Sequence, residues 1–417
     1  MKGEKAATHV DVLVIGGGAA GMMAAGHAAE SGKKILLLER NKRLGEKLRI
    51  SGGSRCNITN AEDDSKKLLA FYGDAEQFLY SSFAEFGVKE TFQFFESRGL
   101  PLKVEALKRV FPKSEKAADV VKVLEQYMKE VGVVVRTGAG VKEVQAKDGK
   151  IETVVTTAGE FSADSYILAT GGLSHPETGS TGDGFTWLKA LGHTVVPPTP
   201  TIVPLKVKEK WVKELSGKSM KDVKVNFLVE GKKKFSRTGS VLFTHFGVSG
   251  PTILNSAGMV SDLMHEGQVT ITIDTAPTLD LGILDRRITE VFDQNKNKLL
   301  KNVFKELAPA GTSDTLLSLL PDIDPELKVH SVTKDKRRAL AELLKAIPLT
   351  VTGLMDFDRA VLADGGVPLT EVDMRTMRSK KIENLFITGD LLHIRRPSGG
   401  YSLQLCWTTG YVAGGNA

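Results

Sequence analysis

Cysteine, aromatic residues and long apolar runs are all scarce in this 417-residue chain. The two cysteines, Cys56 and Cys406, lie far apart in the sequence, whereas a disulfide reductase pairs them as C-x-x-C, so a dithiol relay is not expected. No apolar run reaches membrane-spanning length, and residues 1–5 lack the apolar stretch of a signal peptide. These absences predict a cytoplasmic protein that does not span a membrane.

Excess positive charge is modest, at a formal net charge of +6, and it gathers in one middle segment. Acidic residues intersperse the lysines of this segment, and no aromatic residues alternate with them as in a surface that stacks nucleic-acid bases. A solvated face is therefore favoured and a nucleic-acid partner is not expected, although RNA binding stays open as an alternative. These lysines are Lys206, Lys208, Lys210, Lys213, Lys218, Lys221, Lys224, Lys232, Lys233 and Lys234.

The most informative motif lies near the N-terminus. An apolar strand over residues 10–15 leads into Gly16-Gly17-Gly18-Ala19-Ala20-Gly21, and an Ala-rich helix follows over residues 22–31. This glycine spacing lets a backbone turn approach a pyrophosphate, whose charge the helix N-terminus then meets. A second apolar strand, residues 35–38, ends at Glu39, about 20 residues after the glycines, where a carboxylate accepts ribose hydroxyls. The pattern predicts a βαβ unit that binds an ADP moiety.

A second cofactor signature near the C-terminus indicates which dinucleotide is bound. Residues 384–388 form an apolar strand that ends in Gly389-Asp390, and Ser398-Gly399-Gly400-Tyr401 then opens another apolar segment. In FAD enzymes such an aspartate binds a ribitol hydroxyl, and the helix N-terminus stabilises the anionic reduced flavin. NAD has no ribitol, so we predict FAD. No second G-x-G-x-x-G follows Gly21, so NAD(P)H is expected at most as a transient electron donor. Metal-ligand spacing is absent as well, and no metal site is predicted.

With Ala169-Thr170-Gly171-Gly172 after a strand over residues 166–168, the chain resembles two-dinucleotide-fold flavoproteins of the glutathione-reductase type. Residues 51–60, SGGSRCNITN, and 243–251, FTHFGVSGP, are similar to the bacterial BaiN/RdsA-like (YhiN-type) NAD(P)/FAD-dependent oxidoreductases. Asp364-Gly365-Gly366-Val367 strengthens the match, which covers almost the whole chain. The resemblance implies an α/β fold in which a Rossmann-like FAD-binding domain is interrupted by an inserted β-barrel-like domain and a helical subdomain.

The motifs and the resemblance together imply a set of residues that contact FAD. Arg55 is expected to pair with phosphate or flavin because a planar guanidinium suits both. Cys56 is expected to be a small buried filler, and Val144 is placed near the adenine by the resemblance alone. The predicted FAD contacts are Gly16, Gly18, Ala19, Ala20, Gly21, Glu39, Arg40, Lys47, Ser51, Gly53, Arg55, Cys56, Asn57, Val144, Thr170, Gly171, Gly389, Asp390, Gly399, Gly400 and Tyr401.

Three residues are candidates for substrate chemistry. His245 precedes the helix start at 249–251, where a structural role competes with proton transfer. His393 and Arg395 follow Asp390 in a segment where most relatives resemble Gly-Glu-x-Leu-Asp-x-x-Gly, so a histidine replaces an acid here. Arg395 and Arg396 either make the mouth of the site cationic or pair with surface carboxylates.

The order of these motifs predicts the domain organisation. Prolines at 197, 198 and 200 forbid both a helix and a central strand, and so mark a boundary. The glycine-rich loop 178–184 is interpreted as packing at the cofactor or at a domain interface. We expect the first part of the FAD domain over 1–195, an antiparallel β domain over 196–277, a helical subdomain over 278–348 and the second part of the FAD domain over 349–417.

The predicted function is that of an FAD-dependent oxidoreductase, which exchanges hydride or electrons between flavin N5 and a small organic substrate. The resemblance implies either oxidation of amines or reduction of conjugated carbonyl compounds. An RNA-associated flavoprotein that uses the basic insertion and a flavin-binding scaffold without turnover are the alternatives. The sequence leaves the oligomeric state open.

Overall fold

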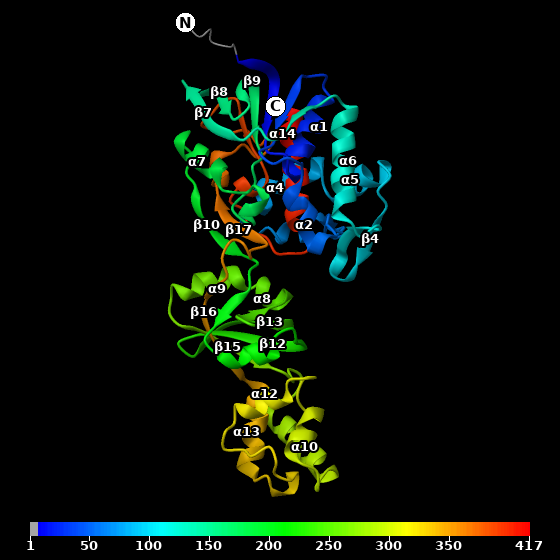
Figure 1. Ribbon diagram of the computed structural model, residues 1–417, viewed down its shortest axis with the longest axis vertical. Coiled ribbons are helices and arrows are strands. Elements are labelled where there is room, and N and C mark those ends of the chain that lie inside the picture. Colours follow the sequence, from blue (N-terminus) through cyan, green and yellow to red (C-terminus); the bar gives the residue numbers. More distant parts are fainter. Residues whose placement is uncertain (1–6) are drawn as a thin grey trace. The chain divides into compact units, whose positions relative to one another are not determined.

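The computed structural model describes residues 7–417, which divide into two compact units. Unit 1 contains the described residues up to Thr199 together with Val361–Ala417, and unit 2 contains Pro200–Ala360 (Figure 1). The domain boundaries predicted from the sequence stay predictions.

The core of unit 1 is a seven-stranded sheet in the order β6-β2-β1-β9-β8-β7, with β18 also paired to β9. Strands β6, β2, β1, β9 and β18 run parallel, whereas β7 and β8 form an antiparallel meander on β9. This arrangement confirms the predicted Rossmann-like domain. Its strands are β1 (Thr8–Ile15), β2 (Ile35–Leu38), β6 (Val134–Arg136), β7 (Val141–Lys147), β8 (Lys150–Thr156), β9 (Gly159–Leu168) and β18 (Leu385–Ile387).

Strand β9 is longer than the sequence indicated. The sequence pattern predicts two separate strands, over residues 160–162 and 166–168, but the structure joins them into one. Its first half pairs with β8 and its second half with β18, so a single strand serves both the meander and the centre of the sheet. The polar residues between the two predicted strands pair with β1 at this point, which periodicity alone does not reveal.

Helices from the two ends of the chain lie side by side in unit 1: α1 (Ala19–Ala29) and α14 (Tyr401–Asn416) (Figure 1). A Cβ at Gly410 would lie 2.4 Å from the carbonyl oxygen of Ala20, and one at Gly414 would lie 2.5 Å from that of Ala24. Glycine is therefore required for these helices to approach so closely. The contact holds the C-terminal cofactor motif against the N-terminal one.

Amphipathic helices and a small three-stranded sheet, ordered β3-β5-β4, complete unit 1. Helices α4 and α6 match the segments 75–86 and 116–129 whose apolar spacing predicts helices. These elements are α2 (Glu46–Ser54), β3 (Thr59–Asn60), α3 (Ser65–Ala70), α4 (Glu76–Glu85), α5 (Val88–Ser97), β4 (Leu102–Glu105), β5 (Arg109–Pro112), α6 (Ala117–Glu130) and α7 (Asp183–Ala190), with β10 (Val196–Thr201) paired to β17 (Leu362–Gly366).

Unit 2 is built on a closed six-stranded barrel, which confirms the predicted barrel-like insertion. Strand β16 closes this barrel. Its residues Ile347, Leu349 and Val351 are buried in the core of unit 2, and it pairs with β15 and β11. The barrel strands are β11 (Leu205–Val207), β12 (Ser219–Val229), β13 (Lys232–Thr244), β14 (Gly247–Ser249), β15 (Val269–Asp274) and β16 (Ile347–Leu354).

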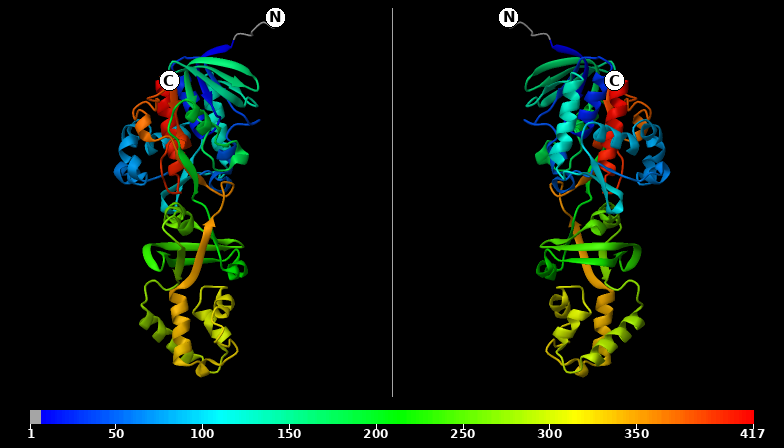
Figure 2. Two further views of the ribbon diagram at one scale, coloured as in Figure 1. Left: turned by 90° about the vertical axis from the view of Figure 1, so that its left-hand side faces the viewer. Right: turned by 90° about the vertical axis from the view of Figure 1, so that its right-hand side faces the viewer.

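The helices of unit 2 share one hydrophobic core with the barrel. Figure 2 shows α10 to α13 gathered at one end of the barrel. Among residues 7–417 no helix combines the length and apolar character needed to cross a membrane. The helices are α8 (Pro251–Leu254), α9 (Ala257–Met264), α10 (Leu281–Gln294), α11 (Leu300–Val303), α12 (Ser313–Ser318) and α13 (Lys334–Lys345).

Candidate functional site

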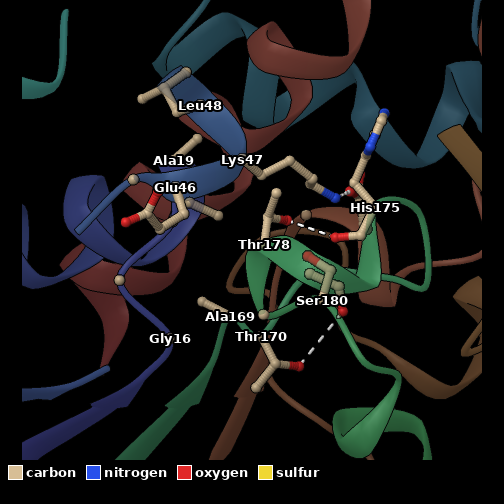
Figure 3. Close-up of a pocket in the computed structure, with 18 of the residues that line it drawn as sticks. Gly16, Ala19, Glu46, Lys47, Leu48, Ala169, Thr170, His175, Thr178 and Ser180 are labelled. Atoms are coloured by element: carbon tan, nitrogen blue, oxygen red, sulfur yellow. Dashed lines mark hydrogen bonds and ion pairs between the residues drawn. The ribbon is translucent and has the colours of Figure 1, made fainter. Parts of the chain in front are cut away.

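A cavity of about 390 Å³ lies in unit 1 at the carboxyl ends of β1, β2, β9 and β18, where open α/β sheets bind their ligands. Figure 3 shows Glu46, Lys47 and Leu48 of α2 on one side, across from Thr170 and the loop that carries His175. The predicted FAD contacts that line the cavity are Gly16, Gly18, Ala19, Ala20, Glu39, Arg40, Lys47, Ser51, Gly53, Thr170, Gly171, Gly389 and Asp390.

Two glycines of the N-terminal motif are tightly packed against backbone atoms, whereas a third faces open space. A Cβ at Gly16 would lie 2.5 Å from the carbonyl oxygen of Ala169, and one at Gly21 would lie 1.9 Å from the oxygen of Gly16. Gly18 differs, because a Cβ there would meet no protein atom within 4 Å. Gly18 lines the cavity and is the N-cap of α1, so a phosphate could lie against its backbone at the positive end of the helix.

Glu39 is buried at the end of β2, and its carboxylate binds backbone N–H groups of the glycine motif and of the segment that follows β2. Its carboxylate accepts hydrogen bonds from the backbone N–H of Gly17 at 2.7 Å and of Asn41 at 2.8 Å. Burial raises the pKa of Glu39, and these two backbone hydrogen bonds oppose that shift. A carboxylate has about four acceptor positions, so two hydrogen bonds leave capacity for the ribose hydroxyls expected from the sequence.

Asp390 is buried at the end of β18 between two cations. Its Oδ2 lies 3.0 Å from Nζ of Lys47, and its Oδ1 pairs with the guanidinium of Arg396. Burial alone would raise the pKa of Asp390, but Lys47 and Arg396 lower it to about 2. Asp390 is therefore an anion throughout the physiological pH range.

The positions of the two carboxylates fit one extended dinucleotide. Glu39 follows β2 and Asp390 lies just beyond β18, and β1 and β9 separate these strands. Three strand spacings place the two ends about 14 Å apart. With the open face of Gly18 lying along the cavity that joins them, the residues present fit FAD. The roles of Glu39 at the adenosine ribose and of Asp390 at the ribitol stay predictions.

Several predicted contacts lie outside the cavity lining. Gly400 instead packs against β3, since a Cβ there would lie 2.2 Å from the carbonyl carbon of Thr59. Val144 pairs with Val154 in the meander, while its neighbour Val141 lines the cavity. The predicted contacts that do not line the cavity are Gly21, Arg55, Cys56, Asn57, Val144, Gly399, Gly400 and Tyr401.

Arg55 makes different contacts from those expected. Its guanidinium lies 2.5 Å from Glu105 and 3.0 Å from Glu115, and it stacks over Phe111. Glu105 and Glu115 thus balance charge within the protein, and both also pair with Lys103. Nearby, Cys56 is fully buried and burial raises its pKa to about 12, as suits a structural filler. Their roles as FAD contacts stay predictions.

None of the three candidates for substrate chemistry is among the residues that line the cavity. His393 is half-buried in unit 1, and its Nδ1 has no hydrogen-bond partner among residues 7–417. Burial is the main cause that lowers the pKa of His393. Arg395 is 61% exposed, with its Nε 3.6 Å from Asp364. His245 is exposed in unit 2 beside Phe246.

Sequence reasoning missed a large part of the cavity wall. The sequence places the loop 178–184 either at the cofactor or at a domain interface; its residues 178–183 line the cavity, and Asn41 Nδ2 donates to the carbonyl of Thr178 at 2.9 Å. Its Gly-Ser-Thr-Gly run was the available signal. Other lining residues without a motif are Ile50, Ala139, Gly140, His175, Trp187, Val361, Leu362, Ser402, Leu403 and Cys406.

Comparison with known proteins identifies the family. The family model for the HI0933-like protein Rossmann domain matches residues 10–416. The chain belongs to this family. It is 30% identical over 404 residues to a 3-dehydro-bile acid delta(4,6)-reductase of Clostridium scindens, covering 96% of this chain and 97% of that protein. It is 26% identical over 405 residues to a ribosomal RNA dihydrouridine synthase of Haemophilus influenzae, covering 96% of each.

A solved structure shares the fold. The 3-ketosteroid-delta4-(5alpha)-dehydrogenase from Rhodococcus jostii RHA1, in complex with 4-androstene-3,17-dione, matches with a TM-score of 0.53 and 16% identity, covering 98% of this chain and 96% of that one. The family and the fold together confirm the BaiN/RdsA-like resemblance and the FAD-binding fold. The protein is an FAD-dependent oxidoreductase.

Proposed function

We propose that the protein uses FAD to reduce a carbon–carbon double bond conjugated to a carbonyl group in a small, largely apolar molecule. The observation that carries this proposal is the chemistry shared by the two curated relatives. The name of one describes reduction of bile-acid double bonds, and the name of the other describes conversion of uridine to dihydrouridine. Both reactions saturate a double bond beside a carbonyl, which favours reduction of conjugated carbonyl compounds over amine oxidation.

The wall of the cavity supports an apolar substrate. Ile50 and Val361 both line it and are 43% and 51% exposed, and Trp187 and Leu403 add further apolar surface. Exposed apolar side chains that gather in a cavity indicate a surface that a ligand covers. The adenine and isoalloxazine rings of FAD would cover part of this surface, and in our proposal a fused-ring ketone covers the apolar surface that the cofactor leaves.

Bound FAD would supply the hydride that the β-carbon of the substrate receives. We assign the proton at the α-carbon to His393, which lies three residues after Asp390 in the same loop. Its Nδ1 is buried and makes no hydrogen bond to residues 7–417, so this atom can still exchange a proton with a bound molecule. Arg395 is the arginine of this segment that remains exposed, so we assign it, and not Arg396, to an anionic group on the substrate.

His393→Gln tests the proton assignment. We expect this change to slow the reduction of a conjugated ketone by about a hundredfold or more, because general acids contribute in that range. Reduction of FAD by an electron donor, measured separately by stopped-flow absorbance, should keep its wild-type rate. An equal loss in both half-reactions would show that His393 serves the cofactor instead.

Ribosomal RNA is the second candidate substrate, favoured by the relative from Haemophilus influenzae. Within the lysine-rich hairpin of β12 and β13, Phe235 stacks on the buried Phe227 at 4.4 Å and is not free to stack on a base. Lys234 pairs with Glu266 and Lys206 pairs with Asp356. We therefore rank RNA second.

A direct competition separates these two substrates. The reduced protein is offered a steroid-type conjugated ketone and, in parallel, ribosomal RNA that lacks dihydrouridine, and both products are quantified by mass spectrometry. Saturation of the ketone alone is the expected result. Formation of dihydrouridine at a higher kcat/KM would reverse the ranking.

A further inference from the structure

Three charges meet beside the cavity in a site that excludes most water. The side chain of Arg396 is 1% exposed, that of Asp390 is 9% exposed and that of Lys47 is 29% exposed. Two cations and one anion leave a net charge of +1 in this triad, Lys47–Asp390–Arg396. Charges act more strongly in such a site than at a surface, because little water screens them.

Arg396 also holds the loop between β18 and α14 in shape. Its Nη1 donates to the carbonyl of Ile394 at 2.7 Å, and its Nε donates to Oγ of Ser402 at 3.2 Å. Asp390 lies at the start of this loop and Ser402 in the first turn of α14, and both line the cavity. A buried guanidinium is stable only with an ionised partner, so the carboxylate and the loop geometry depend on each other.

The triad lies where the ring end of a bound flavin is expected. Helix α14 has 16 residues, and Ser402 and Leu403 of its first turn line the cavity, so its positive end faces the same space. Of the other charged groups that line the cavity, Arg40 pairs with Asp183 at 2.8 Å, and Glu46 pairs at 2.9 Å with Arg43, which lies outside the lining. Glu39 lies at the opposite, adenosine end.

We propose that the net positive charge of the Lys47–Asp390–Arg396 triad raises the reduction potential of the bound flavin. Uptake of two electrons and one proton from a donor gives the flavin one more negative charge than it had when oxidised. A fixed positive charge nearby lowers the free energy of that reduced form relative to the oxidised form. The proposal rests on FAD binding in this cavity and not on the identity of the substrate.

A charge series tests the proposal with three substitutions. Lys47→Gln and Arg396→Gln each reduce the charge of the triad from +1 to 0, whereas Asp390→Asn increases it to +2. The midpoint potential, measured by spectroelectrochemistry at saturating FAD, should fall in the first two variants and rise in the third. Asp390→Asn should also weaken FAD binding at least tenfold, because a ribitol acceptor is lost.

The opposite shifts in midpoint potential distinguish an effect of the triad's charge from an effect of altered structure. A merely structural triad would move all three potentials in the same direction, and a potential of Asp390→Asn at or below that of the wild type would overturn the proposal. Arg396→Lys keeps the charge and should retain the wild-type potential. If Arg396→Gln does not fold, Lys47→Gln still tests the proposal, because Lys47 is partly exposed and its replacement should be tolerated by the fold. An unchanged midpoint potential in Lys47→Gln contradicts the proposal.

Arg98→Gln is the matched control. It removes an arginine of the same unit that stacks on Phe94 and Tyr127 and does not line the cavity, so its potential should equal that of the wild type. A wild-type protein that binds no FAD would remove the premise. A wild-type protein that binds FAD but reduces no conjugated ketone would leave the charge series fully informative.

Discussion

At the scale of single residues, the cavity depends on one glycine that is open and others that are packed. Gly16 and Gly21 bring backbone atoms together, while Gly18 leaves room that no protein atom fills. The sequence motif treats all three alike. Gly16 and Gly21 are therefore required by the packing of the backbone, and we expect Gly18 to be the glycine that the cofactor requires.

Gly18→Val tests this separation. We expect the variant to fold with a near wild-type thermal midpoint, because a Cβ at Gly18 meets no protein atom and its φ of −85° suits any residue. FAD retention should fall at least tenfold, because the side chain occupies the space of the pyrophosphate. Gly21→Val is the comparison, and it should lower the thermal midpoint of the FAD-free protein. Full FAD content in Gly18→Val would refute the assigned phosphate position.

Asp390 predicts a specific dependence of stability on pH. The pKa of a free aspartate is about 3.9, whereas Lys47 and Arg396 lower that of Asp390 to about 2 in the folded chain. The folded state therefore binds fewer protons than the unfolded state between these values. The stabilisation is fully present above about pH 4 and is lost as the pH falls toward about 2.

Thermal unfolding of the FAD-free wild type and of Asp390→Asn measures this effect. At about pH 6 the variant should melt at a lower temperature, because Arg396 loses its buried partner. The difference between the two midpoints should shrink as the pH falls below about 4, where the wild-type carboxylate becomes protonated in the unfolded chain. A difference that stays constant over this range would show that Asp390 is not the titrating group.

At the scale of elements, the sequence predicted the strands and helices that carry a strong period or motif. The βαβ unit, the meander and the amphipathic α10 and α13 all follow from local patterns. The continuity of β9, the barrel strand β16 and the loop 178–183 do not, because each is defined by partners distant in the chain. Arg396 is another such case, since its role depends on a carboxylate and a hydroxyl that only folding brings to it.

Gly400→Ala tests the start of α14. Gly400 has a φ of +104°, and a Cβ there would lie 2.2 Å from backbone atoms of Thr59, so the helix N-terminus must shift. We expect a lower thermal midpoint and a several-fold weaker FAD affinity, both measured on purified protein. Gly353→Ala is the control, since a Cβ there meets no atom within 4 Å, and it should change neither quantity. Equal behaviour of the two variants would contradict the role given to Gly400.

At the scale of the whole molecule, the cofactor cavity is formed by unit 1 alone, from segments at both ends of the chain. The two motifs predicted from sequence are thus parts of one site, which the pairing of β18 with β9 and the packing of α14 on α1 bring together. The substrate could not be predicted in this way. Apolar residues such as Ile50 and Val361 belong to no motif, and their exposure becomes visible only in the folded chain.

In the proposed reaction, FAD bound in this cavity would supply the hydride that a conjugated double bond receives. The most direct test is reoxidation of the chemically reduced protein under anaerobic conditions, followed by the flavin absorbance after mixing with a conjugated ketone or its saturated analogue. We predict that the conjugated ketone restores the oxidised spectrum with one saturated product per flavin, and that the saturated analogue does not. A flavin that oxygen reoxidises but no conjugated carbonyl compound does would contradict the account.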